Sequence, residues 1–107
     1  MEDFSAINKS GDLSELHSSA DNAAELLKTL SHRGRLMILC NLADGEKSVG
    51  ELEEMLDTRQ AAVSQQLARL RKDNLVSFRR DGKTVYYSLA DRRARQVIEL
   101  LYALYCR

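Results

Sequence analysis

The stretch Thr58–Lys83, TRQAAVSQQLARLRKDNLVSFRRDGK, decides the fold of this chain. Its first half predicts a helix over residues 60–72, because apolar side chains recur there at helical spacing. These side chains are Val63, Leu67 and Leu70. Its second half predicts a β-hairpin, because Asp81-Gly82 separates two runs rich in β-forming residues. A polar helix followed at once by a basic hairpin is typical of a winged helix-turn-helix, a mainly α fold with a small β-hairpin.

Polar and basic side chains that can reach the base edges and phosphates of DNA are concentrated in the same stretch. Residues 1–58 hold 5 basic and 12 acidic side chains, a net charge of −7, whereas residues 59–83 hold 7 basic and 2 acidic, a net charge of +5. Residues 84–107 add 4 basic and 2 acidic side chains, so the whole chain is neutral. Such a run can be merely solvated surface, but beside a predicted hairpin it indicates DNA binding. The candidate DNA-binding residues are Arg59, Gln60, Ser64, Gln65, Arg69, Arg79, Arg80 and Lys83.

Length and composition predict a single domain. The chain has 107 residues, many aliphatic side chains, few aromatic ones and no Pro or Trp, which suits a mostly helical domain. No apolar run approaches the ~18 residues of a membrane span, and the polar, acidic N-terminus does not match a secretory signal. We therefore expect a cytoplasmic protein that does not contact a membrane. Residues 1–13 are expected to form a flexible arm, and residues 14–107 the DNA-binding and dimerisation domain.

Local signals predict where the other elements begin and end. Ser48 and Glu51 form a capping box, which starts a helix. Gly45 is a helix stop, and Asn74 tolerates the left-handed backbone that often closes a helix. Asp91 is expected to cap the last helix. The expected helices cover residues 14–29, 33–42, 48–56, 60–72 and 92–105, and the expected strands cover 75–80 and 84–89.

The last predicted helix has more apolar surface than one small domain needs. Its residues 97–105, VIELLYALY, are almost all apolar. An unpartnered apolar helix face predicts a protein partner, and we expect the first helix of a second copy in a two-fold dimer. The alternative is that this helix only covers the core of its own domain.

Several motifs together resemble the ArsR/SmtB family of bacterial repressors. Residues 31–39, SHRGRLMIL, are similar to the family signature SHPxRLxIL, with Arg33 in place of Pro. The similarity continues at residues 49–52 (VGEL), 63–71 (VSQQLARLR), 75–76 (LV), 79–83 (RRDGK) and 87–89 (YSL). It covers roughly residues 17–107. A second departure is Thr58-Arg59, where the family more often has an apolar residue and Ser.

The resemblance implies a homodimeric winged-helix repressor that binds an imperfect inverted repeat in promoter DNA and is released by an inducer. By position, Gln60, Ser64 and Gln65 would lie in the major groove and Arg69 near the backbone. The basic residues of the hairpin would lie along or in the minor groove.

Many members of the family sense metals, which requires ligand side chains at defined positions. One family site is a C-x-C pattern on the third helix, but residues 48–56, SVGELEEML, contain no Cys. Another uses Asp and His on the last helix, where this chain has Asp91 but carries Arg93 in place of His. Because a soft-metal site needs three or four convergent thiolates or imidazoles, we expect neither a metal nor another cofactor. His17 lies elsewhere, and His32 is expected to be a structural residue at a helix start.

The two cysteines point to a different signal. Cys40 lies on the second helix and Cys106 at the end of the chain, and in this fold the second and last helices lie close enough for two such thiols to meet. This arrangement resembles the persulfide-sensing BigR/SqrR-like branch of the family. It implies that reactive sulfur species link the two thiols through a disulfide or polysulfide bridge and lower DNA affinity. Inert cysteines with an unknown inducer, and a metal- or haem-responsive repressor with structural cysteines, remain alternatives.

Two other classes of function fit the sequence less well. An enzyme is not expected, because the chain shows neither a CxxC at a helix start nor a positioned nucleophile and base. A winged helix that binds only proteins would leave the basic segment over residues 59–83 without a role. Loss of promoter binding as salt rises would favour DNA over a protein partner.

Overall fold

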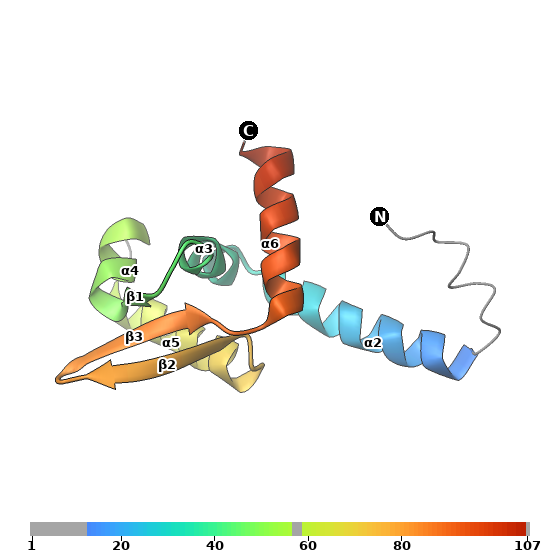
Figure 1. Cartoon of the computed structure of the whole chain (residues 1–107), viewed down its shortest axis with the longest axis horizontal. Coiled ribbons are helices and arrows are strands. Elements are labelled where there is room, and N and C mark those ends of the chain that lie inside the picture. The colour runs from blue at the N-terminus through green and yellow to red at the C-terminus, as the bar shows by residue number, and fades with distance from the viewer. Residues whose placement is uncertain (1–12, 57–58, 107) are drawn as a thin grey trace.

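The computed structural model describes residues 13–56 and 59–106, and in this part of the chain five helices pack with a small three-stranded sheet (Figure 1). The predicted arm, residues 1–13, lies outside the described residues except for Leu13, which is already helical. No described helix is both long and apolar enough to cross a membrane. The elements are α2 (Leu13–Leu30), α3 (Arg33–Leu42), β1 (Lys47–Ser48), α4 (Val49–Leu56), α5 (Gln60–Lys72), β2 (Val76–Asp81), β3 (Thr84–Leu89) and α6 (Arg92–Tyr105).

Side-chain caps start three of these helices, as the sequence predicts. Ser48 Oγ accepts a hydrogen bond from the Glu51 backbone N–H at 3.1 Å, and Glu51 Oε1 accepts one from the Ser48 N–H at 3.0 Å. Asp91 Oδ1 accepts from the Ala94 N–H at 2.8 Å. His32 Nδ1 accepts from the N–H of Gly34 at 3.1 Å, which confirms its structural role at the start of α3. Each cap satisfies backbone donors that a helix leaves without partners and contributes about 1 kcal/mol.

The hairpin differs by one residue from the sequence-based prediction. Asp81 pairs with Thr84, so the loop consists of Gly82 and Lys83, whereas the sequence placed Asp81 in the turn. Gly82 has φ +62°, and Gly at the first position of a two-residue loop matches the right-handed twist of the strands. Asn74 also has positive φ (60°), as expected from its place after α5.

The predicted hairpin is confirmed, and β1 adds a third strand that the sequence did not predict. The strand order is β1-β3-β2, and both pairs are antiparallel. In the β1 pair, Lys47 stands opposite Tyr87 and Ser48 opposite Tyr86. Two residues are too few to show an alternating pattern, so sequence periodicity could not reveal this strand.

The core lies between α3, α4, α5 and the inner face of the sheet. The expected apolar face of α5 is buried there, with Val63, Leu67 and Leu70 at most 1% exposed. Other fully buried side chains are Ile38, Leu39, Leu42, Leu52 and Ile98.

Two helices are poorly covered by this core. In Figure 1, α2 extends sideways from the body and α6 stands upright beside α3. Among the described residues of α2, only Thr29 and Leu30 are buried. The large apolar side chains that remain exposed on the two helices are Leu13, Leu27, Leu100, Tyr102, Leu104 and Tyr105.

Candidate functional site

Helix α5 has one apolar face in the core and one polar face toward solvent. Ser64 and Gln65 are exposed on the polar face. Arg59 is the N-cap residue of α5 and is exposed, but its side chain forms no capping hydrogen bond. Helix α5 begins at Gln60, whose side chain lies outside the described residues. The predicted base-reading residues that are described therefore share one accessible surface.

The neighbouring Gln66 points in a different direction. Arg35 Nη1 on α3 donates to Gln66 Oε1 at 3.4 Å, and Arg35 Nε donates to the Thr29 carbonyl oxygen at 2.9 Å. Arg35 thus joins α5 to the end of α2. The sequence offered no sign of this link, because three separate helices supply its members.

Arg69, predicted to lie near the DNA backbone, belongs to a second link with α2. Its Nε donates to Asp73 Oδ2 at 3.0 Å, and Thr29 Oγ1 donates to the same oxygen at 2.8 Å. Partial burial alone would raise the pKa of Asp73. The two hydrogen bonds and the charges of Arg69 and Lys72 outweigh that effect, so the pKa lies below its ordinary value. The i,i+4 spacing of Arg69 and Asp73 was a sequence signal for this ion pair.

The basic residues of the hairpin lie on different faces of the sheet. Arg79 pairs with Tyr86 and Arg80 with Val85, so the two arginines point to opposite sides. Arg80 and Lys83 are exposed, and neither forms an ion pair within the described part of the chain. Arg79 forms a two-pronged ion pair with Glu46, a residue that the sequence did not mark out.

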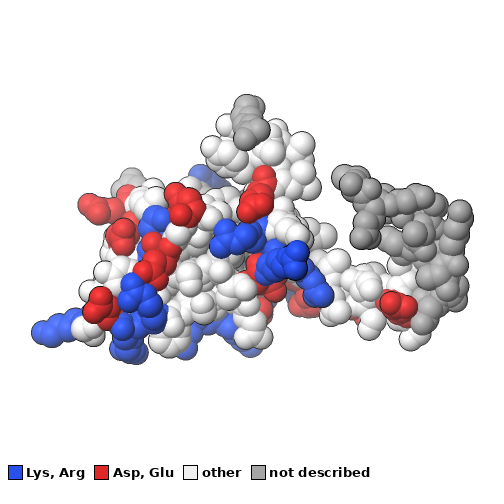
Figure 2. Space-filling view, viewed as in Figure 1, with Lys and Arg blue, Asp and Glu red and all other residues white. Residues whose placement is uncertain are grey.

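Basic side chains gather along one edge of the visible surface, whereas acidic and basic side chains are mixed over the rest of it (Figure 2). In Figure 2, Lys and Arg side chains line the lower edge of the body, where the hairpin and α5 lie. Acidic side chains lie higher, over α4 and the adjoining turn. This arrangement gives the edge formed by α5 and the hairpin a potential that attracts a polyanion.

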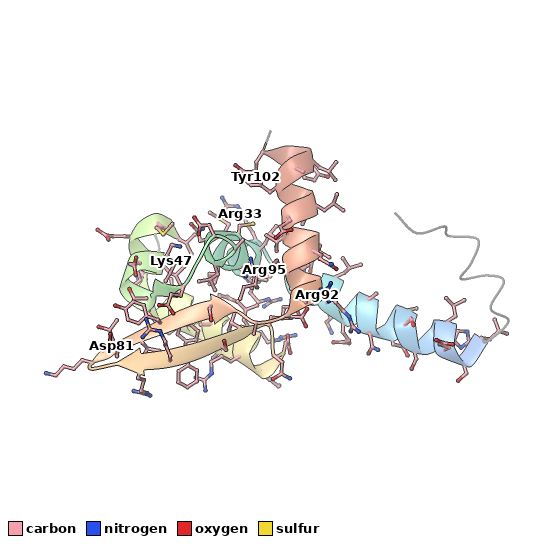
Figure 3. All side chains as sticks on the ribbon, in the orientation of Figure 1. Arg33, Lys47, Asp81, Arg92, Arg95 and Tyr102 are labelled. Carbon is pink, nitrogen blue, oxygen red and sulfur yellow. The ribbon has the colours of Figure 1, made fainter. Side chains whose placement is uncertain are left out.

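Cys40 lies on α3, and Cys106 lies at the end of α6. Both are exposed free thiols, and Cys106 is the C-cap residue of α6. Partial burial beside α6 raises the pKa of the Cys40 thiol, and the nearby charge of Cys106 raises it further. Arg95, labelled in Figure 3, links α6 to the end of α3, because its Nη1 donates to the Ala43 carbonyl at 2.8 Å.

The described residues contain no group of three or more His, Cys, Asp or Glu side chains that could hold a metal. Asp91 and Arg93 line a groove of about 720 Å³ between α2, the end of α5 and the start of α6. Asp91 is occupied as a helix cap there, and a guanidinium beside it repels a cation.

Comparisons with known proteins agree on the kind of molecule. A family model described as "Bacterial regulatory protein, arsR family" matches residues 32–77. The biofilm growth-associated repressor of Agrobacterium fabrum is 50% identical, over 88% of this chain and 80% of that protein. The solved structure of reduced HlyU from Vibrio cholerae is 45% identical with a TM-score of 0.85, over 89% of this chain and 100% of that one. The repressor BigR from Xylella fastidiosa is 42% identical with a TM-score of 0.82, over 90% and 98% of the two chains.

Proposed function

Because this chain belongs to the ArsR family of bacterial regulatory proteins, we propose that it is a dimeric, thiol-controlled repressor of transcription. It binds promoter DNA when Cys40 and Cys106 are reduced, and it is released when reactive sulfur species link them. The family establishes a DNA-binding regulator with the winged-helix fold. The electrostatic interaction of the Cys106 thiol with the Cys40 thiol, between α6 and α3, supports the proposed signal.

The polar face of α5 and the tip of the hairpin form the DNA-binding surface. Ser64 and Gln65, with Gln60 beside them, contact base edges in the major groove. Arg59 and Arg69 contact the phosphate backbone near the two ends of α5. In the hairpin, Arg80 and Lys83 contact phosphates along the minor groove.

A second copy covers the exposed apolar faces of α2 and α6. Leu100 is 53% exposed and Leu104 64% exposed on α6, and Leu27 is 58% exposed on α2. Apolar surface on this scale supports a two-fold interface. In such a dimer each α5 reads one half-site, so the operator is an imperfect inverted repeat with half-sites about 34 Å apart, one turn of DNA.

The thiol reaction balances without a further oxidant when the inducer is a persulfide. One cysteine thiolate attacks the outer sulfur of RSSH, displaces RS⁻ and becomes a protein persulfide. The other thiolate attacks the protein-bound sulfur of that persulfide and displaces HS⁻, leaving a disulfide. In total, two protein thiols and one RSSH give one disulfide, RSH and H₂S. If the protein persulfide instead reacts with a persulfide formed on the other cysteine, HS⁻ leaves and a trisulfide results.

A bridge between Cys40 and Cys106 joins α3 to α6. Helix α3 holds α5 through Arg35 and Gln66, and α6 contributes to the proposed dimer interface. Locking the angle between α3 and α6 therefore changes the spacing of the two recognition helices. Such coupling between two sites typically changes affinity by about 5- to 150-fold.

Intact mass and DNA affinity, measured on the same persulfide-treated sample, test this function. We expect a Cys40–Cys106 cross-link, with the mass of two hydrogens lost or with sulfur atoms added, and reduced binding to the chain's own upstream promoter. Cys40→Ser and Cys106→Ser should each keep DNA affinity after treatment. If the wild-type cysteines stay unmodified and binding is unchanged, the sulfur signal is wrong, and zinc and haem are titrated next.

A further inference from the structure

Two neighbouring residues of β2, Phe78 and Arg79, make contacts on opposite faces of the hairpin. On the inner face, the ring of Phe78 lies 5.9 Å from that of Tyr87, and the guanidinium of Arg71 on α5 lies 4.3 Å above Phe78. On the outer face, the guanidinium of Arg79 lies 4.7 Å above the ring of Tyr86. The inner contacts join the hairpin to the recognition helix, and the outer contact continues across the sheet.

On the outer face, Arg79 also forms an ion pair with Glu46. Arg79 Nε donates to Glu46 Oε2 at 3.0 Å, and Nη2 donates to Oε1. The hydrogen bonds raise the pKa of Arg79 and lower that of Glu46. Arg79 lies on edge strand β2, Tyr86 lies on central strand β3, and Glu46 lies directly before β1. These contacts of Arg79 with Tyr86 and Glu46, here called the clasp, therefore span the whole sheet. The clasp joins residues 33 positions apart.

The hairpin needs support on this face because its tip projects beyond β1. Only Tyr86 and Tyr87 of β3 pair with β1, whereas β3 pairs with β2 along its whole length. Asp81, near the tip, lies well away from the helices in Figure 3. A small change in the angle of the sheet therefore moves the tip by a large distance relative to α5.

We infer that Arg79 is a positioning residue, which with Glu46 sets the angle of the hairpin so that Arg80 and Lys83 meet the DNA backbone. The inference rests on the proposed DNA binding and assigns Arg79 a role different from the phosphate contact expected from the sequence. Its guanidinium is already paired with a carboxylate on the outer face. Arg80 projects from the opposite face, which it shares with Phe78 and the contact to α5.

The salt dependence of DNA affinity separates positioning from phosphate contact. The full-length reduced protein is titrated with its upstream promoter duplex over a series of salt concentrations. Arg80→Ala should lower affinity and reduce the slope of log K against log salt by roughly 2 for a dimer, ~0.9 for each lost phosphate contact. Arg79→Ala should lower affinity about 2- to 5-fold, the range of an exposed ion pair, and leave the slope unchanged.

Substitutions at Glu46 should change DNA affinity in the opposite direction from the one that simple electrostatics predicts. Glu46→Gln removes a negative charge, which by itself strengthens DNA binding, but loss of the clasp should weaken it as Arg79→Ala does. The charge swap E46R/R79E should restore most of the wild-type affinity. If Glu46→Gln tightens binding, or Arg79→Ala reduces the slope as much as Arg80→Ala, Arg79 is a phosphate contact and the inference is wrong.

A measurement without DNA keeps the clasp testable by itself. In the free protein, NMR order parameters of residues 79–86 should fall from about 0.85 toward 0.6 in Glu46→Gln and recover in the charge swap. Unchanged order parameters in Glu46→Gln would show that the clasp does not position the hairpin. A wild-type protein with an ordered hairpin that does not bind DNA would instead remove the proposed function.

Discussion

Helices α5 and α6 have similar lengths, 13 and 14 residues, and both are amphipathic, yet only α5 has its apolar face covered within one chain. Leu67 of α5 is 1% exposed, whereas Leu104 of α6 is 64% exposed. The part of the molecule that we propose to read DNA is thus complete in a single chain. The part that carries Cys106 is complete only when something covers α6. The difference allows the proposed signal at α6 to change how two copies are arranged without unfolding α5.

The largest expected effect comes from the buried face of α5. Leu67→Ala removes a fully buried side chain and leaves a cavity, so it should lower the free energy of unfolding by about 2–5 kcal/mol. Gln65→Ala, on the exposed face of the same helix, should change it by less than ~0.5 kcal/mol while reducing discrimination between operator and random DNA. Urea unfolding monitored by circular dichroism measures the change in the free energy of unfolding for both variants. Equal effects would contradict the assignment of the two faces.

Exposed leucines on α6 should affect assembly instead. The double substitution L100S/L104S should raise the dimer dissociation constant roughly 30-fold or more, because the two side chains together contribute at least about 2 kcal/mol of apolar burial. Analytical ultracentrifugation measures the change. Met55→Ser is the matched control, because Met55 is 50% exposed on α4, outside the proposed interface. A double variant that dimerises like wild type would show that α6 is not covered by a second copy.

The link between α2 and α5 should have an intermediate effect. Thr29→Val removes the hydrogen bond to Asp73, so stability should fall by about 1–2 kcal/mol at neutral pH and the pKa of Asp73 should rise.

The pH dependence of this effect has a definite sign. Because the pKa of Asp73 is lowered by folding, its contribution is complete above the ordinary carboxyl pKa and is lost as pH falls through the lowered value. The stability difference between wild type and Thr29→Val should therefore shrink in acid. Unfolding curves at several pH values, with NMR titration of Asp73, test this. A difference that stays constant with pH would assign the effect to packing alone.

The smallest expected effect lies at the start of α5. Arg59 occupies an N-cap position without making a side-chain cap, so Arg59→Ser should stabilise the fold by about 0.5–1 kcal/mol. The same change should weaken DNA binding, because a proposed phosphate contact is lost. A Ser48→Ala variant, which removes an existing cap, should instead destabilise the protein by a similar amount. Thermal unfolding of the two variants gives the comparison, and a destabilised Arg59→Ser protein would contradict it.

Local sequence signals predicted most of the fold. The predicted bounds of α3 and α6, residues 33–42 and 92–105, agree with the structure. Helix periodicity and caps act over three or four residues, so spacing alone encodes them. The strand β1 escaped prediction because it has only two residues and exists through its pairing with β3.

The sequence by itself determined the helices, their caps, the hairpin and the concentration of positive charge on residues 59–83. Only the tertiary structure decided which partners those side chains have. It paired Arg79 with Glu46 and joined Thr29 to Asp73 across 44 positions. The physical reason is that these contacts depend on the packing angles of separate elements. Those angles follow from how the whole core fills, not from any local spacing of residues.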